Sequence, residues 1–585
     1  PFVETDFIFA AIGEELGMAG SAAVLMAFLI LVGSGLRIAL RALRVFDKLF
    51  ALGLTTLLGV QAFVIIGGVL RVVPLTGITL PFVSYGGSSP GEALTRAADC
   101  GDDVNRRIRR LGVVFALLYV MLFVQLNRVQ FFGAERLQED VNNTRGLIRE
   151  FGRPRGPIVT ADGVLLARSL PHDGSVDFVR DYPEGDLYAH IVGYQSLNVA
   201  ATGLERAYND ELAGVPVEQQ FLSFGDLFAD RDTTATLRLS IRHDVQEAAR
   251  SALGDQLGSV VALDPRTGEI IAMWTYPSFD PNVLADPDGF AANAAFAELR
   301  ADPNDPLLAK AYREIFFPGS TFKLVTAAAG MESGLVDATE PVYAERDSYE
   351  PIPAGASIGN FGDSTCGGDL VEILRVSCNT AFAEMGAEWV GPAGMIETAE
   401  AFGFNTSLNI DLPSAAPSRF PTEYGERLAD VDFYRGSDDN EAAGSLLPNG
   451  SVSIHEDSAR LAQTVIGQND VAATPLQMAL VAAAIANEGK MMSPHVVVEL
   501  VAADGSIYEE IEPEISRIAI RPSTAATLAE AMRVVANEGT ARNLLIEGLD
   551  IGGKTGTAQV GTDPPNSHAW VVGFAGLSGE EPSLA

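Results

Sequence analysis

A serine and a lysine three residues apart are the first candidates for chemistry in this chain. Ser320 follows the chain-reversing pair Pro318-Gly319 and precedes the helix-forming run 324–329, so we expect it at a helix N-terminus. Lys323 then lies over the same helical face as the serine. A serine hydroxyl is a weak nucleophile at neutral pH, and a desolvated lysine amine within hydrogen-bond reach can activate it. The pair predicts nucleophilic catalysis, although S-x-x-K alone also fits a helix cap followed by a surface lysine.

Two further motifs favour the catalytic interpretation. Ser377-Cys378-Asn379 precedes a predicted helical run over 380–390. Lys554-Thr555-Gly556-Thr557 lies on a predicted strand over 551–560, which forms a hairpin with a second strand over 568–574. S-x-x-K, then S-x-N, then K-T-G is the motif order of penicillin-binding proteins and serine β-lactamases, and the chain resembles these families.

The composition divides the chain in two. Residues 1–131 are very apolar, whereas the remainder is an acidic globular sequence, and 585 residues exceed one domain. The net charge of −36 excludes a phosphate backbone as partner, so no nucleic acid is expected. We attribute the acidity to solubility or a salty habitat. The six histidines are scattered without H-E-x-x-H spacing, so no metal site is predicted.

Two apolar segments, 16–36 and 49–70, are long enough to cross a bilayer. Four basic residues lie between them, which places that loop in the cytoplasm and residues 1–15 and 71–90 outside. A buried soluble helix would explain either segment alone, but not two adjacent ones with the basic residues gathered in one loop.

The flanks of these segments resemble a known membrane family. Residues 5–17 and 74–89 are similar to the C-terminal part of the SEDS family, the RodA/FtsW polymerases that join lipid II into glycan strands. Asp6 matches the outward-facing acidic residue of that family, and such a carboxylate can act as a base or hold a divalent cation. A helix N-cap is the alternative role for Asp6.

Only the last part of that family is present, without its final helix. The arginine cluster at 106–110 favours the cytoplasm, so one membrane crossing is missing between 71 and 105, unless the segment 72–89 re-enters the membrane and returns. Two explanations remain open: a fusion of neighbouring polymerase and transpeptidase genes damaged at the join, or a misplaced basic cluster in a non-functional product. We interpret both chain ends as cut.

A third apolar run, 111–126, extends to 132 and is interpreted as a membrane anchor, with a cleaved signal peptide as its rival. Residues 143–158 then resemble the entry to the N-terminal pedestal of class B penicillin-binding proteins. A predicted hairpin at 258–273 and the segments 463–479 and 568–575 resemble the transpeptidase domain of the actinobacterial PbpA-like group. The resemblance covers roughly 105–585.

The expected fold is multidomain, with N-terminal transmembrane α-helices, an α+β pedestal and an α/β transpeptidase domain of the penicillin-binding/serine β-lactamase type, built as an antiparallel sheet flanked by helices. The predicted boundaries are a SEDS fragment at 1–90, a junction at 91–110, an anchor at 111–132, a pedestal at 133–240 and a C-terminally truncated transpeptidase domain at 241–585.

The resemblance implies a role for each motif residue in acyl transfer from D-Ala-D-Ala. Ser320 is the expected nucleophile and Lys323 its base; Ser377 relays a proton, and Asn379 binds the substrate amide and holds Lys323. Lys554 supplies positive charge and lowers the pKa of Lys323.

The rest of the K-T-G strand is expected to bind substrate. Thr555 and Thr557 share one face and can bind the substrate carboxylate, and Gly556 allows a substrate strand to approach. The resemblance also implies an oxyanion hole formed by the backbone N–H groups of Ser320 and Thr557.

Transpeptidation is expected to need no cofactor, whereas the SEDS part could hold a divalent cation. The expected partners are peptidoglycan stem peptides, lipid II, β-lactams, a SEDS polymerase and other elongation or division proteins. The expected location is the bacterial cell membrane, with the catalytic domain extracytoplasmic.

Two questions remain open from the sequence. Cys366 and Cys378, 12 residues apart, can form a disulfide or remain two buried thiols. The favoured function is a D,D-transpeptidase fused to a remnant of a lipid II polymerase, in which glycosyltransferase activity is not expected in isolation. The alternatives are a β-lactamase or D,D-carboxypeptidase, and a non-catalytic scaffold that activates a cell-wall polymerase.

Overall fold

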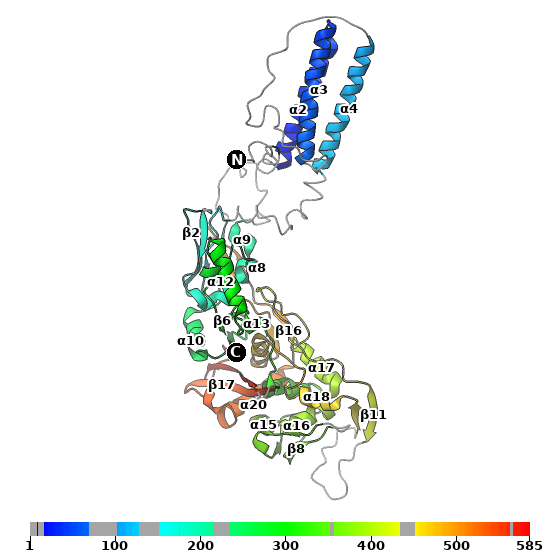
Figure 1. Ribbon diagram of the computed structural model, residues 1–585. Coiled ribbons are helices and arrows are strands. Elements are labelled where there is room, and N and C mark those ends of the chain that lie inside the picture. Colours follow the sequence, from blue (N-terminus) through cyan, green and yellow to red (C-terminus); the bar gives the residue numbers. More distant parts are fainter. Residues whose placement is uncertain are drawn as a thin grey trace. The chain divides into compact units, whose positions relative to one another are not determined.

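The computed structural model describes residues 9, 17–69, 102–127, 151–174, 176–214, 234–351, 356–432, 451–561 and 566–585. They belong to two compact units, Pro1–Gly146 and Leu147–Ala585, each with a hydrophobic core of its own. Figure 1 labels their helices and strands. The division follows the composition, because the first unit holds the apolar segments and the second the acidic globular sequence.

Three helices make up most of the described part of the first unit: α2 (Gly17–Arg41), α3 (Val45–Val69) and α4 (Asp102–Asn127). Glycines allow the helices to approach closely. A Cβ atom at Gly35 would clash with the Thr55 side chain, and one at Gly59 would lie 2.6 Å from the Phe115 ring. Close approach at small residues is typical of helices packed within membranes.

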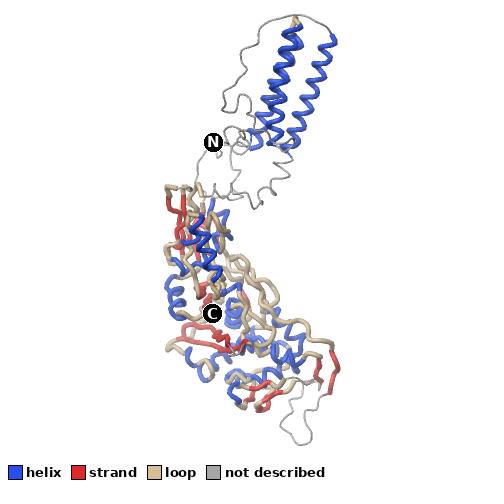
Figure 2. Tube along the Cα trace, viewed as in Figure 1, coloured by secondary structure: helices blue, strands red, loops and turns tan. Residues whose placement is uncertain are grey.

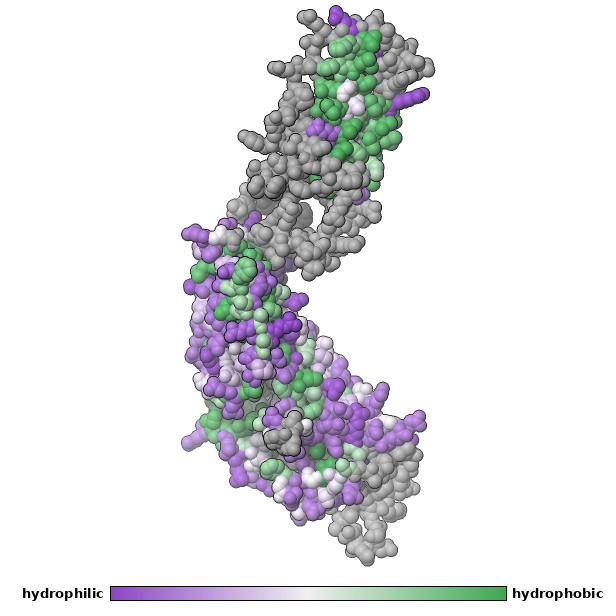
Figure 3. Space-filling model, viewed as in Figure 1, coloured by the Kyte–Doolittle hydropathy of each residue, from purple (hydrophilic) through white to green (hydrophobic). Residues whose placement is uncertain are grey.

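The outer faces of these helices are apolar, as the green surface in Figure 3 shows. Met26 and Ile30, for example, are more than half exposed. Gly20–Arg41 and Val45–Val69 are long and apolar enough to cross a membrane, in agreement with the segments predicted at 16–36 and 49–70. The apolar part of α4, Val113–Gln125, is shorter, so the anchor at 111–132 stays a prediction.

A six-stranded sheet is the frame of the pedestal, in the order β15–β14–β4–β1–β2–β3. The pair β1–β4 is parallel and the other pairs are antiparallel. The strands are β1 (Ile158–Val159), β2 (Leu165–Pro171), β3 (Phe178–Asp181), β4 (Ala235–Leu239), β14 (Val497–Ala502) and β15 (Ile507–Glu510). Because β14 and β15 come from residues 497–510, main-chain pairing crosses the predicted boundary between 240 and 241.

A buried ion network fixes one side of this sheet. Glu205, on the short helix α8 (Gly203–Ala207), has a side chain that is 0% exposed and lies between two arginines. Arg155 Nε donates to Glu205 Oε2 at 3.1 Å, and Arg180 Nε donates to Glu205 Oε1. Arg180 also donates to the carbonyls of Arg155 and Gly156, so the network holds the end of the segment 143–158 that we predicted at the pedestal entry.

Two antiparallel hairpins form the catalytic sheet: β5 (Gly258–Leu263) with β6 (Ile270–Tyr276), and β17 (Leu549–Val560) with β18 (Asn566–Leu577). Both hairpins were predicted from the sequence. Ala585 exchanges two main-chain hydrogen bonds with Leu263, and Leu584 pairs with Ala575, so this segment joins the two hairpins.

Helices cover the catalytic sheet, as Figure 2 shows, which confirms the predicted antiparallel sheet flanked by helices. The central helix α14 (Lys323–Glu332) is buried from Lys323 to Gly330, and its sequence there is mostly small and apolar, with three alanines, one leucine and one valine. It packs against α17 (Gly391–Ala401) and α20 (Pro522–Glu538), and α20 also packs against β17. The helix α19 (Pro475–Ala486) contacts both β5 and β18.

The remaining α-helices and β-strands of the second unit are as follows. The helices are α7 (Ala189–Val192), α9 (Asn209–Ala213), α10 (His243–Leu253), α11 (Asn282–Ala285), α12 (Gly289–Ala301), α13 (Lys310–Arg313), α15 (Leu370–Arg375), α16 (Asn379–Glu384) and α18 (Ser458–Thr464). The strands are β7 (Tyr343–Arg346), β8 (Ser348–Tyr349), β9 (Ile358–Gly359), β10 (Cys366–Gly368), β11 (Arg427–Asp432), β12 (Ser451–His455), β13 (Lys490–Met492) and β16 (Ile515–Ile518).

We predict that Glu205→Ala lowers the free energy of unfolding by about 3–5 kcal/mol, because it leaves two buried guanidinium groups without their carboxylate. Urea denaturation of the purified chain measures the change. Asp181→Ala is the matched control, since it breaks the exposed pair with Arg168 and should cost about 1 kcal/mol or less. Equal losses in the two variants would contradict a special role for the buried network.

Candidate active site

Ser320 lies just before α14, a helix that is buried along most of its length. Gly319–Phe322 (η4) is a single 3-10 turn that runs directly into α14. Thr321 Oγ1 donates to the Pro318 carbonyl at 2.7 Å and closes the turn. Ser320 is half-buried between the buried residues Gly319 and Thr321. The serine is therefore at a helix start, as the Pro-Gly pair predicts, with its side chain within reach of solvent.

Three glycines allow other segments to meet at this turn. Gly319 has a φ of +54° and donates its N–H to the Gly467 carbonyl at 2.9 Å. A Cβ atom at Gly467 would clash with the Gly319 carbonyl, and one at Gly556 would lie 2.8 Å from the Pro318 carbonyl oxygen. Gly556 is thus required for the packing of η4 against β17. Our sequence analysis assigned it only to the approach of a substrate strand.

Lys323 is the buried amine of the site, with 0% of the residue exposed. Its Nζ donates to the Ser377 carbonyl and to Asn379 Oδ1, each at 2.7 Å, and to Ser377 Oγ at 3.3 Å. These bonds use the three hydrogens of an ammonium group. Asn379 therefore lies where it can hold the lysine, and one of its Nδ2 hydrogens bonds to the Gly359 carbonyl.

The Ser377 hydroxyl lies between two lysine amines. Lys554 Nζ, from strand β17, donates to Ser377 Oγ at 2.9 Å and to the Thr555 carbonyl at 2.9 Å. Lys554 is 0% exposed, like Lys323. A hydroxyl that contacts both amines can accept a proton from one and give a proton to the other, which is the geometry that a relay requires.

Burial changes the ionisation of both amines. Desolvation first, and then the nearby charge of Lys554, lowers the pKa of Lys323 well below its usual value of 10.5. Desolvation lowers the pKa of Lys554 to about 7. The lowered pKa of Lys323 favours its neutral amine, which is the form that a general base requires. The effect of Lys554 on Lys323 has the predicted direction, but desolvation is the larger cause.

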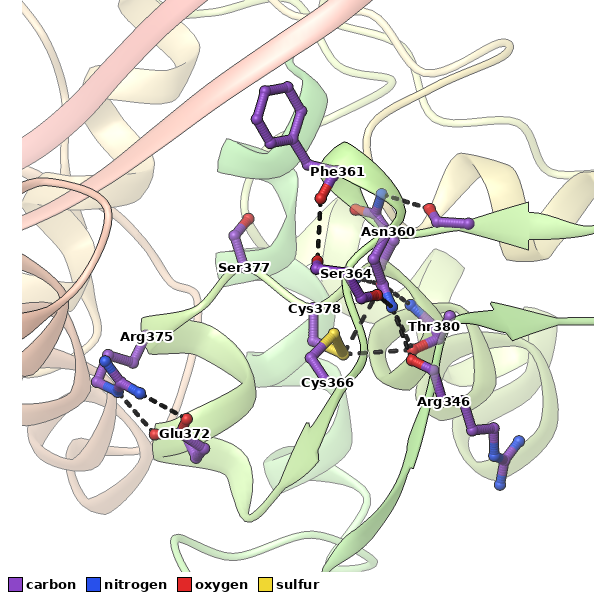
Figure 4. Close-up of a disulfide and its surroundings, with 12 residues drawn as sticks. Arg346, Asn360, Phe361, Ser364, Cys366, Glu372, Arg375, Ser377, Cys378 and Thr380 are labelled. Carbon is purple, nitrogen blue, oxygen red and sulfur yellow. Dashed lines mark hydrogen bonds and ion pairs between the residues drawn. A yellow bond between two sulfur atoms is a disulfide. The ribbon is translucent and has the colours of Figure 1, made fainter.

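The S-x-N segment begins with a residue in the left-handed backbone conformation. Ser377 has a φ of +60°, a region that costs a residue with a side chain about 1–3 kcal/mol. The next residue, Cys378, is fixed by its N–H bond to the Ile373 carbonyl at 2.8 Å and by a disulfide to Cys366 (Figure 4). Of the two possibilities left open by the sequence, the structure shows the disulfide.

Asn360 caps the helix that follows this segment. Its Oδ1 accepts the N–H groups of Asn379 at 2.9 Å and Thr380 at 3.1 Å, at the start of α16. Its Nδ2 donates to the carbonyls of Arg346 and Ser364 (Figure 4). Our sequence analysis missed Asn360. The turn residues around it predict local hydrogen bonds, but give no indication of partners 20 residues away.

The K-T-G strand presents its threonines on the face opposite Lys554. Burial alternates along β17, with Lys554 and Gly556 buried, Thr555 half-buried and Thr557 exposed. Thr555 Oγ1 donates to Thr540 Oγ1 at 2.9 Å, which leaves Thr557 with the freer hydroxyl. A Cβ atom at Gly319 would lie 2.7 Å from the Thr557 carbonyl oxygen, so the Thr557 backbone runs beside the Ser320 turn.

The structure thus joins four predicted residues by hydrogen bonds (Lys323, Ser377, Asn379 and Lys554), and packs Ser320, Gly556 and Thr557 beside them. Asp6 lies outside the described residues. Within the described part of the chain, no group of three or more His, Cys, Asp or Glu residues could hold a metal ion.

Comparison with known proteins identifies the family of this chain. Residues 258–581 match the penicillin-binding protein transpeptidase domain, and residues 155–236 match the penicillin-binding protein A dimerisation domain. The chain is 38% identical over 495 residues to the peptidoglycan D,D-transpeptidase PbpA of Mycolicibacterium smegmatis, covering 82% of this chain and 93% of that protein. The chain belongs to the penicillin-binding protein transpeptidase family.

A solved structure of this family is similar in fold. The ceftriaxone acyl-enzyme complex of penicillin-binding protein A from Mycobacterium tuberculosis matches with a TM-score of 0.63 and 33% identity, covering 75% of this chain and 92% of that one.

The N-terminal residues 1–96 match a second family, the cell cycle proteins that include FtsW and RodA. Here the chain is 52% identical over 89 residues to the peptidoglycan glycosyltransferase RodA of Mycobacterium bovis, which is 15% of this chain and 19% of that protein. In this chain a RodA-like segment therefore precedes the penicillin-binding part. The segment matches about a fifth of the length of RodA.

We predict that the Cys366–Cys378 disulfide supports the active site. Cys366→Ser should lower the free energy of unfolding by about 2–4 kcal/mol and slow acylation by penicillin, because it releases the segment that carries Ser377 and Asn379. Urea denaturation and the rate of penicillin labelling measure the two effects. A reductant should reproduce both in the unaltered chain and add nothing in the variant. Labelling at an unchanged rate after reduction would overturn the prediction.

We also predict that acylation accelerates as the pH rises, because the base is the neutral amine of Lys323. In Lys554→Gln the pKa of Lys323 should rise, since a neighbouring positive charge is removed, and the midpoint of the pH–rate profile should move to higher pH. The second-order rate of penicillin acylation against pH measures this. Lys490→Gln, a partly exposed lysine on β13, is the control and should leave the midpoint unchanged. A downward shift in Lys554→Gln would contradict the assignment.

Proposed function

We propose that this chain is a serine D,D-transpeptidase that cross-links peptidoglycan stem peptides and is acylated by β-lactams. The observation that carries the proposal is the Ser377 hydroxyl, bonded to the amines of both Lys323 and Lys554 beside Ser320. The activity in the name of the M. smegmatis relative and the acyl-enzyme state of the M. tuberculosis structure support it.

The first half-reaction needs a nucleophile and a path for one proton. Ser320 Oγ attacks the carbonyl carbon of the D-Ala-D-Ala bond, while the neutral amine of Lys323 takes the hydroxyl proton. As the tetrahedral intermediate collapses, the C–N bond breaks and a proton passes through Ser377 Oγ to the departing D-alanine amine. The product is an ester between the stem peptide and Ser320, and free D-alanine.

The second half-reaction repeats these steps in reverse order with a new amine. An acceptor amine from a neighbouring stem peptide attacks the ester carbonyl, loses its proton through the same groups and regenerates Ser320. The backbone N–H groups of Ser320 and Thr557 stabilise the negative oxygen in both steps. Each role is filled by a side chain or backbone group, so we propose that transpeptidation needs no cofactor.

Substrate binding uses the rim of the same site. Asn379 keeps one Nδ2 hydrogen for the substrate amide, because the other is bonded to the Gly359 carbonyl. The exposed hydroxyl of Thr557 binds the substrate carboxylate, and Thr555 contributes through its position on the same strand face. Lys554 supplies positive charge for the carboxylate from the opposite, buried face.

A β-lactamase or D,D-carboxypeptidase would use water in place of the acceptor amine. Among the described residues, the side-chain hydrogen-bond partners of Lys323, Ser377 and Lys554 include no carboxylate that could activate such a water. This disfavours a β-lactamase that activates water with a carboxylate held in this network. The connected hydrogen bonds around Ser377 favour the transpeptidase over a non-catalytic scaffold.

We propose that the protein is held in the bacterial cell membrane by its N-terminal helices, with the catalytic domain on the extracytoplasmic side where stem peptides are exposed. The RodA-like segment supports a SEDS polymerase and its substrate lipid II as partners, together with other elongation or division proteins. The segment is about a fifth of its relative, so we propose no polymerase activity for it alone. In a complete polymerase Asp6 would be the acidic residue, as base or divalent-cation ligand.

Labelling the full chain with a fluorescent penicillin, followed by intact mass, tests the assignment. We expect one adduct in the unaltered chain and none in Ser320→Ala, because the other hydroxyl beside Lys323, that of Ser377, is assigned to the proton relay and not to nucleophilic attack. Ser251→Ala, an exposed serine on α10, is the matched control and should label normally.

The lifetime of the adduct separates the alternatives. An adduct that persists, together with cross-linking of stem peptides, supports the transpeptidase. Rapid loss with release of hydrolysed drug would indicate a β-lactamase. Absence of any adduct in the unaltered chain would favour the scaffold, and labelling that survives in Ser320→Ala would refute the choice of nucleophile.

A further inference from the structure

A cavity of about 530 Å³ lies within the second unit, at the joint between the pedestal and the catalytic domain. Its walls come from α7 and α8 on the pedestal side, and from α12, α13 and residues 413–414 on the other. None of the motif residues of the active site lines it. The volume is in the range that binds small molecules or short peptides.

Three arginines line this cavity: Arg206, Arg300 and Arg313. They come from three different helices, α8, α12 and α13. Within the described part of the chain, none of the three guanidinium groups forms a hydrogen bond or an ion pair. All three residues are exposed to solvent, so their guanidinium groups are accessible to a ligand that enters the cavity.

Each arginine sits in the last turn of its helix, where a positive charge is favourable. That position explains each residue singly. It does not explain why α8 and the neighbouring helices α12 and α13 direct their basic ends to one cavity. Asp305 is the acidic residue in the lining, so three positive charges face one negative charge.

The rest of the wall is neutral and largely apolar. Phe279 and Phe296 contribute aromatic rings, and Leu299 and Leu307 contribute aliphatic surface. His190 contacts the Phe279 ring edge-on and bonds through Nε2 to the Pro306 carbonyl. Burial lowers the pKa of His190 to about 4, so it adds no charge at neutral pH. The cavity therefore combines an apolar interior with unpaired guanidinium groups.

We propose that this cavity binds an anionic ligand, a small molecule or short peptide with at least two oxyanion groups on an apolar body. The apolar part is held by Phe279, Phe296 and Leu299, and the oxyanion groups by the arginines. Guanidinium groups suit carboxylate and phosphate equally, because both accept two parallel N–H bonds. The site is distinct from the one that binds the reacting peptide.

A fluorescent probe tests the proposal on the full chain. Dansyl-Glu-Glu carries an aromatic body and three carboxylates, whereas dansyl-Gln-Gln amide has the same body without charge. We expect saturable binding of the first by fluorescence anisotropy, and at least tenfold weaker binding of the second. Dansyl-phosphoserine, measured in parallel, shows whether phosphate is preferred to carboxylate.

Arg300→Gln and Arg313→Gln should each weaken binding of dansyl-Glu-Glu about tenfold, the loss expected for a charge-assisted hydrogen bond. Arg242→Gln removes an exposed arginine that is paired with Asp244 outside the cavity, and should leave binding unchanged. Normal penicillin labelling of each variant shows that it is folded and that the active site is intact.

Three results would overturn the proposal. They are the absence of saturable binding by either charged probe, equal binding of the charged and uncharged probes, and charged-probe binding that both cavity variants retain in full. A variant that fails to label with penicillin is replaced by Arg206→Gln, which removes the third guanidinium from the other wall.

Discussion

The catalytic domain must hold two buried lysine amines in contact with one serine hydroxyl, and the rest of its structure depends on this constraint. Removing an ammonium group from water is unfavourable, and placing two of them on the same hydroxyl adds repulsion. The cost falls when an amine gives up its proton, which is why the pKa values of Lys323 and Lys554 are lowered. Burial of Lys323 thus favours the neutral amine that the reaction requires as its base.

Because the contacts between these amines are unfavourable, helices and strands outside the site must hold the two lysines and Ser377 in place. Lys323 belongs to α14, which is buried along most of its length, and Lys554 belongs to a 12-residue strand paired throughout with β18. Ser377, between them, has a left-handed backbone. The disulfide and the Asn360 cap hold its neighbours, so the surrounding chain offsets the strain that is stored at this serine.

The sequence predicted the elements that carry the motifs because their signals are local. The Pro-Gly pair before Ser320 and the alternation along 551–560 each depend on residues close in sequence. The close packing of Gly319, Gly467 and Gly556 could not be predicted, since it joins the backbones of segments up to 237 residues apart. The pairing of β4 with β14 was missed for the same reason. A buried amide such as Asn360 leaves no pattern, because its partners are backbone groups that every residue carries.

The shared sheet has a consequence for the pedestal. Because β14 pairs with β4, and Tyr312 Oη donates to the His190 carbonyl at 3.3 Å, the pedestal is bonded to the catalytic domain through both main chain and side chain. Tyr312 lies on α13, and Phe316, four residues later, is paired with Ala473 just before the Ser320 turn. The helix that lines the arginine cavity is thus continuous with the segment that presents the nucleophile. A spacer would need only a flexible connection, whereas these bonds make the pedestal part of the support of the active site.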